Sequence, residues 1–150
     1  MTLEDARNVA TILGVAIGSV SLIVTAIGVR HNYHVNRARF WLDLRERFSR
    51  HDAVHRRLRP GGSWSNGRLP ITPDDWPEIE AYLGLFEQCE DMLEQRLIDE
   101  PTFRSGYRYR LVNIAQNAPI VEEKLISAAS EWTRLRALLE RMKVPLAKES

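Results

Sequence analysis

The stretch VATILGVAIGSVSLIVTAIGV, residues 9–29, decides how the rest of the chain is organised. Its 21 consecutive residues include no charged side chain and no Asn, Gln, His or Pro. A helix of that length covers about 31 Å, which matches the hydrocarbon core of a bilayer. A buried core helix rarely runs past ~18 residues without a polar face. The stretch therefore predicts a transmembrane helix.

A cleaved signal peptide is the main alternative for this stretch. Such peptides open with a basic segment and have a shorter apolar core, whereas the leader MTLEDARN carries two acids against one arginine, Arg7. Orientation follows from the basic residues in the short flanks. Those on the carboxyl side are Arg30, Arg37, Arg39, Arg45 and Arg47. We therefore predict a single-pass protein of a bacterial inner membrane, with residues 1–8 outside the cell membrane and the C-terminal domain in the cytoplasm.

Small and weakly polar residues of the predicted span fall on one helical stripe. Spacings of three and four residues separate its members, which are Thr11, Gly14, Gly18, Ser21, Thr25 and Gly28. Lipid tails provide no hydrophobic drive for helix association, so close approach at small residues and hydroxyl contacts must supply it. The stripe predicts a homo-oligomer, or pairing with the span of another membrane protein.

The segment that follows the span, residues 30–37, and the start of the next helix suit the headgroup region of a bilayer. Aromatic rings settle at that level, and each arginine near an anionic surface contributes ~1 kcal/mol of attraction. We expect five side chains to contact lipid: Arg30, Tyr33, Arg37, Arg39 and Trp41.

Residues 38–143 predict a small all-α domain of four or five helices, because apolar residues recur at helical spacing and no segment alternates as a strand does. The segment 30–59 contains neither Gly nor Pro and is expected to be helical, with a basic solvent face. A loop rich in Pro and Gly at 59–73 interrupts the pattern. We expect its Trp64 to fold back onto the domain, since burying an aromatic ring is favourable. Residues 144–150 are predicted to be a flexible tail.

Later segments show local signals of helix starts. Thr72, followed by Pro and two Asp residues, predicts a capped N-terminus. Asp99 or Glu100 can cap the next helix, in which Gly106 predicts close contact with a neighbouring helix. Ser130 is the expected cap of a short terminal helix.

Charge is distributed unevenly although the formal net charge is only +1. From Asp74 to Glu100 acidic residues recur and Arg96 is the only base, which predicts a solvated acidic face. Arg104, Arg108 and Arg110 lie in the following helix. With so much acid nearby, these arginines predict ion pairs within the domain and no nucleic-acid partner. The basic helix before the loop and the acidic helix after it are expected to pair.

Three segments carry a resemblance: FWLDLRERFSRHDAVHRRLRP at 40–60, AYLGLFEQCEDMLEQRLIDEPTF at 81–103 and EWTRLRALLERM at 131–142. They include Tyr-Leu-x-x-Phe-Glu followed by Leu-Ile-Asp-Glu. Over residues 38–142 the chain resembles a family of uncharacterised bacterial proteins with an N-terminal span and a small helical domain of unknown function. The resemblance implies that architecture and supplies no activity.

The sharpest candidate for chemistry is His51-Asp52-Ala53-Val54-His55. Two histidines four residues apart share a helical face, as in zinc hydrolases, although Asp52 replaces the expected glutamate. A catalytic zinc also needs a third protein ligand, which no nearby residue supplies. The carboxylates of Glu87, Glu90, Asp91 and Glu94 are a weaker divalent-cation candidate. The single cysteine, Cys89, is expected to be buried and inert.

The sequence as a whole predicts a membrane-anchored helical interaction protein that binds an unknown cytoplasmic protein. In this interpretation it is not an enzyme, and it has no catalytic residue, no metal and no cofactor. The alternative is a membrane-tethered, metal-dependent hydrolase with His51 and His55 as zinc ligands.

Overall fold

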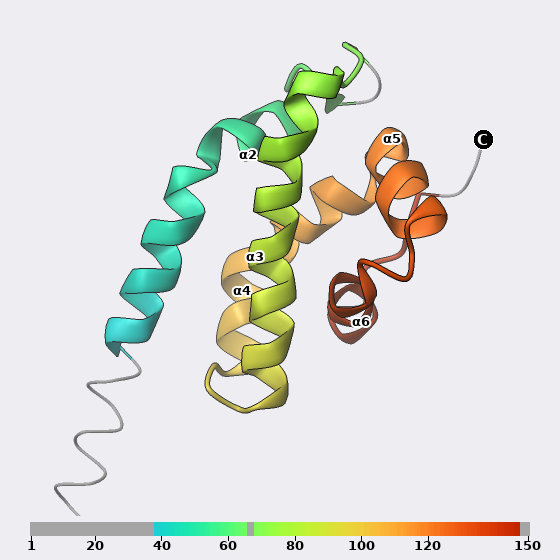
Figure 1. The fold of residues 1–150 in the computed structure, drawn as a ribbon. Coiled ribbons are helices and arrows are strands. Elements are labelled where there is room, and N and C mark those ends of the chain that lie inside the picture. The colour runs from blue at the N-terminus through green and yellow to red at the C-terminus, as the bar shows by residue number, and fades with distance from the viewer. Residues whose placement is uncertain (1–37, 66–67, 148–150) are drawn as a thin grey trace, which may run out of the picture. The chain divides into compact units, whose positions relative to one another are not determined.

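The computed structural model describes residues 38–65 and 68–147 (Figure 1). Every regular element in those ranges is helical, which confirms the all-α prediction for this part of the chain. Among the described residues, none of the helices combines the length and the apolar character needed to cross a membrane. The predicted span at 9–29, its small-residue stripe and the lipid-contacting Arg30, Tyr33 and Arg37 all lie outside the described residues.

The chain divides into two compact units, Met1–Leu42 and Asp43–Ser150. Residues 38–42 of the first unit are helical. In this short piece Arg39 is exposed and Trp41 is half-buried.

The second unit opens with helical residues up to 50, a turn at His51 and α2 (Asp52–Leu58). The helix predicted across 30–59 is thus interrupted at His51. After the Pro/Gly loop come six further elements: η2 (Pro73–Asp75), α3 (Trp76–Glu94), α4 (Glu100–Ala115), α5 (Ala118–Ile120), the π-helix η3 (Val121–Ser127) and α6 (Thr133–Arg141). In Figure 1, α3 lies in the middle of this unit, and α6 packs against it.

Aromatic rings form the centre of the core. The Phe48 ring centroid lies 4.9 Å from that of Phe86, 6.2 Å from that of Tyr82 and 4.6 Å from that of Tyr107. Phe103 stacks on Tyr107 at 5.3 Å. Such contacts add roughly 0.5–1.5 kcal/mol each beyond the burial of area. Helical spacing in the acidic segment predicts one apolar face that includes Leu97. Leu97, beyond the end of α3, is 55% exposed, whereas the other members are buried: Ile79, Tyr82, Leu83, Phe86, Cys89 and Leu93.

Two predicted helix caps are confirmed, and a third is not. Thr72 and Asp75 form a reciprocal capping box, and Asp99 Oδ2 accepts the Thr102 N–H at 2.9 Å. The last helix begins at Thr133 with Trp132 at its N-cap and no capping side chain, so the prediction of Ser130 as a cap was wrong.

The acidic face of α3 is only partly solvated, which corrects part of the prediction: α6 packs along it and Glu90 is buried, whereas Asp91 and Glu94 stay about half-exposed. Arg141 Nη2 lies 2.6 Å from Glu90 Oε1, and Arg134 contacts both Asp91 and Glu94. The basic segment and the acidic helix contact each other through Phe48, Tyr82 and Phe86. Among the described residues, a single ion pair joins the basic segment to the start of the acidic one, between Arg57 and Asp75 at 2.9 Å. Since each exposed ion pair adds only ~0.2–1 kcal/mol, burial of apolar side chains between α3 and α6 holds the interface together.

Part of the segment predicted to be a tail, residues 144–150, contacts the domain. Val144 is 6% exposed, and the Ala147 N–H donates to the Ala115 carbonyl oxygen at 2.8 Å. Residues 144–147 therefore pack on the domain, because an apolar side chain and a backbone hydrogen bond anchor them. Residues 148–150 lie outside the described part.

Gly106 contradicts the prediction of a close helix contact. It is exposed within α4, and a Cβ added there would meet no atom within 4 Å. An alanine costs less backbone entropy in a helix than a glycine does. We therefore expect Gly106→Ala to raise the free energy of unfolding by roughly 0.5–1 kcal/mol, measured by urea denaturation of the full chain. A decrease would mean that the glycine is needed for a contact.

Candidate functional site: an amide-lined pocket

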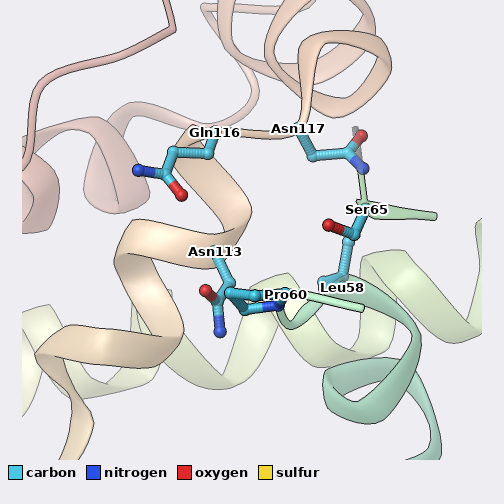
Figure 2. Close-up of a pocket in the computed structure, with 6 residues that line it drawn as sticks. All are labelled: Leu58, Pro60, Ser65, Asn113, Gln116 and Asn117. Carbon is cyan, nitrogen blue, oxygen red and sulfur yellow. The ribbon is translucent and has the colours of Figure 1, made fainter. Parts of the chain in front are cut away.

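A polar pocket lies where α2, the Pro/Gly loop and the end of α4 meet (Figure 2). Its volume is about 140 Å³. Figure 2 shows that the lining residues come from three separate segments: Leu58, Pro60, Ser65, Asn113, Gln116 and Asn117. Two of them are apolar, four carry an amide or a hydroxyl, and none carries a charge.

The loop is fastened to the rest of the domain through Trp64. Trp64 is buried, as the sequence predicted, with 3% of the residue exposed, and its backbone N–H donates to the Arg57 carbonyl oxygen at 3.0 Å. The Arg57 guanidinium lies 4.8 Å from the ring centroid, a cation–π geometry. These contacts set the position of Ser65, the next residue, on the wall of the pocket.

Asn117 joins the loop to the opposite wall. Its Nδ2 donates to the Trp64 carbonyl oxygen at 3.0 Å, and its Oδ1 accepts the Ile120 N–H at 3.1 Å as the N-cap of α5. Both ends of this carboxamide are therefore used, although one N–H of Nδ2 stays available. Asn117 is thus mainly a structural member of the site.

The remaining polar side chains of the pocket are available for a ligand. Within the described part of the chain, no hydrogen bond is formed by the side chains of Ser65, Asn113 or Gln116. Asn113 is 8% exposed and Ser65 is 8% exposed, so both are largely shielded from bulk water. A carboxamide offers two N–H donors and one carbonyl acceptor, and a hydroxyl offers one donor and two lone pairs. The pocket therefore presents unused donors and acceptors together.

The size and charge of the pocket limit what it can do. Sites for cofactors and similar molecules span roughly 300–1,000 Å³, so the volume of about 140 Å³ is too small for them. The lining contains no titratable group, and so the pocket itself offers neither an acid–base pair nor a nucleophile pair. What its lining can do is donate and accept hydrogen bonds.

The pocket was not among the sites predicted from the sequence. Asn113, Gln116 and Asn117 look like the polar end of a helix, and Ser65 looks like a loop residue. The one usable signal was the cluster of three carboxamides within five residues, next to the cap before Pro119. Nothing in the sequence indicated that the loop around Trp64 would close over it.

The side chains of the histidine motif, residues 51–55, contact aromatic rings and an arginine and are not arranged as metal ligands. The His51 ring lies 6.2 Å from the Tyr82 ring, and the His55 ring lies edge-on to Tyr109 at 5.3 Å. The Asp52 carboxylate is paired with Arg110 Nη2 at 2.9 Å. Among the described residues, no group of three or more His, Cys, Asp or Glu side chains is arranged to hold a metal ion.

Burial, together with the nearby Arg110 guanidinium, lowers the pKa of His55 below its ordinary value of 6.5, although the Asp52 carboxylate opposes the shift. The unfolded chain therefore takes up a proton near that ordinary value while the folded domain still resists it. We expect the free energy of unfolding to fall as the pH drops below about 6.5 and to level off below the folded-state pKa.

The measurement that checks this is urea denaturation of the full chain between pH 8 and pH 5, compared with His55→Gln. This variant lacks the titrating imidazole, so its stability should depend less on pH in that window. If the free energy of unfolding depended on pH equally in the two proteins, the pH dependence could not be assigned to His55.

The arginines of α4 are used inside the domain. Arg104 pairs with Glu100 at 2.6 Å and Arg110 pairs with Asp52, so the prediction of internal ion pairs is confirmed for both. Arg108 instead donates to the Met142 and Lys143 carbonyl oxygens at 3.0 and 2.9 Å. Those carbonyls lie at the C-terminus of α6 and have no partner within the helix.

The other candidates are also structural. Of the four carboxylates considered for a cation, three pair with arginines of α6, and Glu87 accepts the Leu135 N–H at 3.3 Å. Cys89 is fully buried, as predicted. Burial raises the pKa of its thiol well above the usual range, which keeps the thiol protonated.

Comparison of the chain with protein-family models, curated proteins and solved structures found no match. The pocket therefore has to be interpreted from its own geometry.

Proposed function

We propose that this chain is a membrane-anchored helical binding module whose cytoplasmic domain recognises a partner protein through the amide-lined pocket. The observation that carries the proposal is the set of unused, neutral hydrogen-bonding groups on Ser65, Asn113 and Gln116 around a small pocket. Groups of this kind favour binding over acid–base catalysis.

Support for the anchor comes from the sequence. The 21 residues of 9–29 have the length and composition of a single span, and the excess of arginine after them favours a cytoplasmic C-terminus. The stripe from Thr11 to Gly28 supports self-association of that span. Two copies of the domain would then present two pockets to a partner, which increases the effective concentration of the second contact.

The anchor is tested by fractionation and by a topology reporter. The full chain should stay in the membrane fraction after alkaline extraction, and a phosphatase fused after Ser150 should be inactive because it remains in the cytoplasm. Replacing Val20 and Ile23 by Arg places two charges in the span, at a cost of roughly 2.5–3.5 kcal/mol each, and should release the chain. A soluble wild-type chain or an active phosphatase would overturn this part.

Self-association has its own measurement. A genetic dimerisation reporter carrying residues 8–30 should lose its signal with Gly14→Ile and with Gly18→Ile, since a bulky side chain keeps the two backbones apart. The matched control is Leu13→Ile, which lies off the stripe and should leave the signal unchanged. A signal unaffected by both glycine substitutions would show that the stripe does not pair.

Binding is tested by affinity purification of the tagged full chain from native membranes. Proteins retained by the wild type should be lost with Gln116→Leu, whose side chain is exposed and makes no hydrogen bond within the described residues. The control Gln88→Leu makes the same change on the exposed side of α3 and should retain them. Identical retention by the two variants would exclude the pocket as the binding site.

A further inference from the structure

The lining of the pocket restricts its ligand by charge. Asn113 and Ser65 are each more than nine-tenths buried, and no lining residue carries a charge that could neutralise an ionic ligand. Moving a carboxylate or ammonium group into such a site would strip its water without a compensating partner, which is strongly unfavourable. The ligand group must therefore be neutral.

Hydrogen bonding restricts it further. Asn113 and Gln116 each offer donors and an acceptor, and Ser65 adds a hydroxyl. A purely apolar group would leave these atoms desolvated and unpaired, at a cost for each. A group with only acceptors would leave the two carboxamide oxygens without donors. A group that donates and accepts at adjacent atoms can pair with the N–H donors and with the carbonyl acceptors of the two carboxamides.

Volume provides the third restriction. A cavity of roughly 150 Å³ holds one benzene molecule, and the pocket measures about 140 Å³. A sugar ring with its hydroxyls, or a nucleobase with its sugar, is larger than that. A side-chain carboxamide and the one or two methylenes that carry it fit, and Leu58 and Pro60 supply apolar contacts for the methylenes.

From these restrictions we infer that the pocket binds the side-chain carboxamide of a glutamine or asparagine in the partner protein. The inference rests on the proposed function and names the chemical class that it recognises. The donor–acceptor edge of the ligand pairs with the carboxamides of Asn113 and Gln116. The Ser65 hydroxyl forms a hydrogen bond with an N–H or a carbonyl lone pair of the ligand that those two residues leave unused.

The test uses three blocked tripeptides, acetyl-Ala-X-Ala-methylamide, in which X is Gln, Glu or Met. The methylamide end leaves the side chain as the only primary carboxamide in the Gln peptide. The Glu peptide keeps the shape and adds a charge, and the Met peptide keeps the length and the backbone amides while removing the hydrogen bonds. Binding is followed by NMR of the full chain in detergent micelles, through the side-chain amide resonances of Asn113 and Gln116.

We expect the Gln peptide to bind at least tenfold more tightly than the Glu and Met peptides, because a site built around hydrogen bonds rejects ligands that leave its polar groups unpaired. Asn113→Leu and Gln116→Leu should each lower the affinity for the Gln peptide at least tenfold, and Gln88→Leu should leave that affinity unchanged. The exposed Gln116 variant keeps the test valid if the buried Asn113 variant unfolds.

Equal binding of all three peptides, or no binding of any, would overturn the inference. Equal binding would point to main-chain recognition. Either result leaves the proposed function standing if Gln116→Leu still releases the retained partner from native membranes. If instead that variant retains the partner while the Gln peptide binds as expected, the carboxamide site exists but the proposed function fails.

Discussion

Arg141→Leu is expected to lower the free energy of unfolding by about 3 kcal/mol, the lower end of the range for breaking a buried ion pair. The Glu90 side chain is 4% exposed and accepts from both Nε and Nη2 of Arg141, the shortest distance being 2.6 Å. Without the guanidinium, the carboxylate stays buried between α3 and α6 and loses its hydrogen-bonded cation, although Arg134 still acts on it from a greater distance. The Arg141 side chain is 34% exposed, and so solvent screens part of the effect.

Two controls make this prediction specific, both measured by urea denaturation of the full chain followed by circular dichroism. Arg134→Leu removes the other arginine of the same interface, but Arg134 is more exposed, so its loss should matter far less. The double variant Glu90→Leu with Arg141→Leu removes the charge together with its partner and should recover most of the lost stability. If the two single arginine variants were equally stable, the buried pair would not be the main polar contact of the interface.

Local features of the fold were predictable because they depend on neighbouring residues. The capping box at Thr72 and the Asp99 cap need only three or four residues in sequence, and both are present. The inward face of α3 follows from helical periodicity and is buried as expected. The burial of Trp64 followed from the hydrophobicity of its ring.

Features that depend on distant residues were not predictable in the same way. The partners of the acidic run on α3 lie 40 and 51 residues further along the chain in α6, as for Glu94 with Arg134 and Glu90 with Arg141. No local pattern distinguishes a carboxylate that faces solvent from one that will be covered. Gly106 shows the reverse error, since a glycine within a helix indicates a close contact only if another helix approaches it.

The site was hidden for the same reason. Asn117 and Trp64 are 53 residues apart, yet the hydrogen bond from Asn117 Nδ2 to the Trp64 carbonyl closes one side of the pocket. Carboxamides at a helix end are ordinary surface residues until a loop covers them. The spacing of the histidine pair is a known signature of zinc hydrolases, whereas a cluster of carboxamides near a helix end has no comparable signature and fits a surface as well as a pocket.

The position of that loop depends on Gly62. A Cβ at residue 62 would lie 2.3 Å from the Arg57 carbonyl oxygen and 2.4 Å from that of Arg56. These are backbone atoms near the end of α2 and cannot swing aside as a side chain can. The Trp64 N–H donates to the same Arg57 oxygen at 3.0 Å. An alanine at this position would therefore push the loop away from the carbonyl that fastens it.

Gly62→Ala should thus lower the free energy of unfolding by about 1–3 kcal/mol, the usual cost of adding a methyl group where there is no room. Gly106→Ala is the matched control, because the same methyl group meets open space there. In that variant the free energy of unfolding should rise instead of fall. The folded Gly62→Ala protein should also show red-shifted tryptophan emission, since Trp64 loses its cover, and weaker binding at the pocket, since Ser65 and the Trp64 carbonyl move with the loop. Unchanged stability in Gly62→Ala would show that the loop has another conformation of equal energy, and the pocket would then not be a fixed feature of the domain.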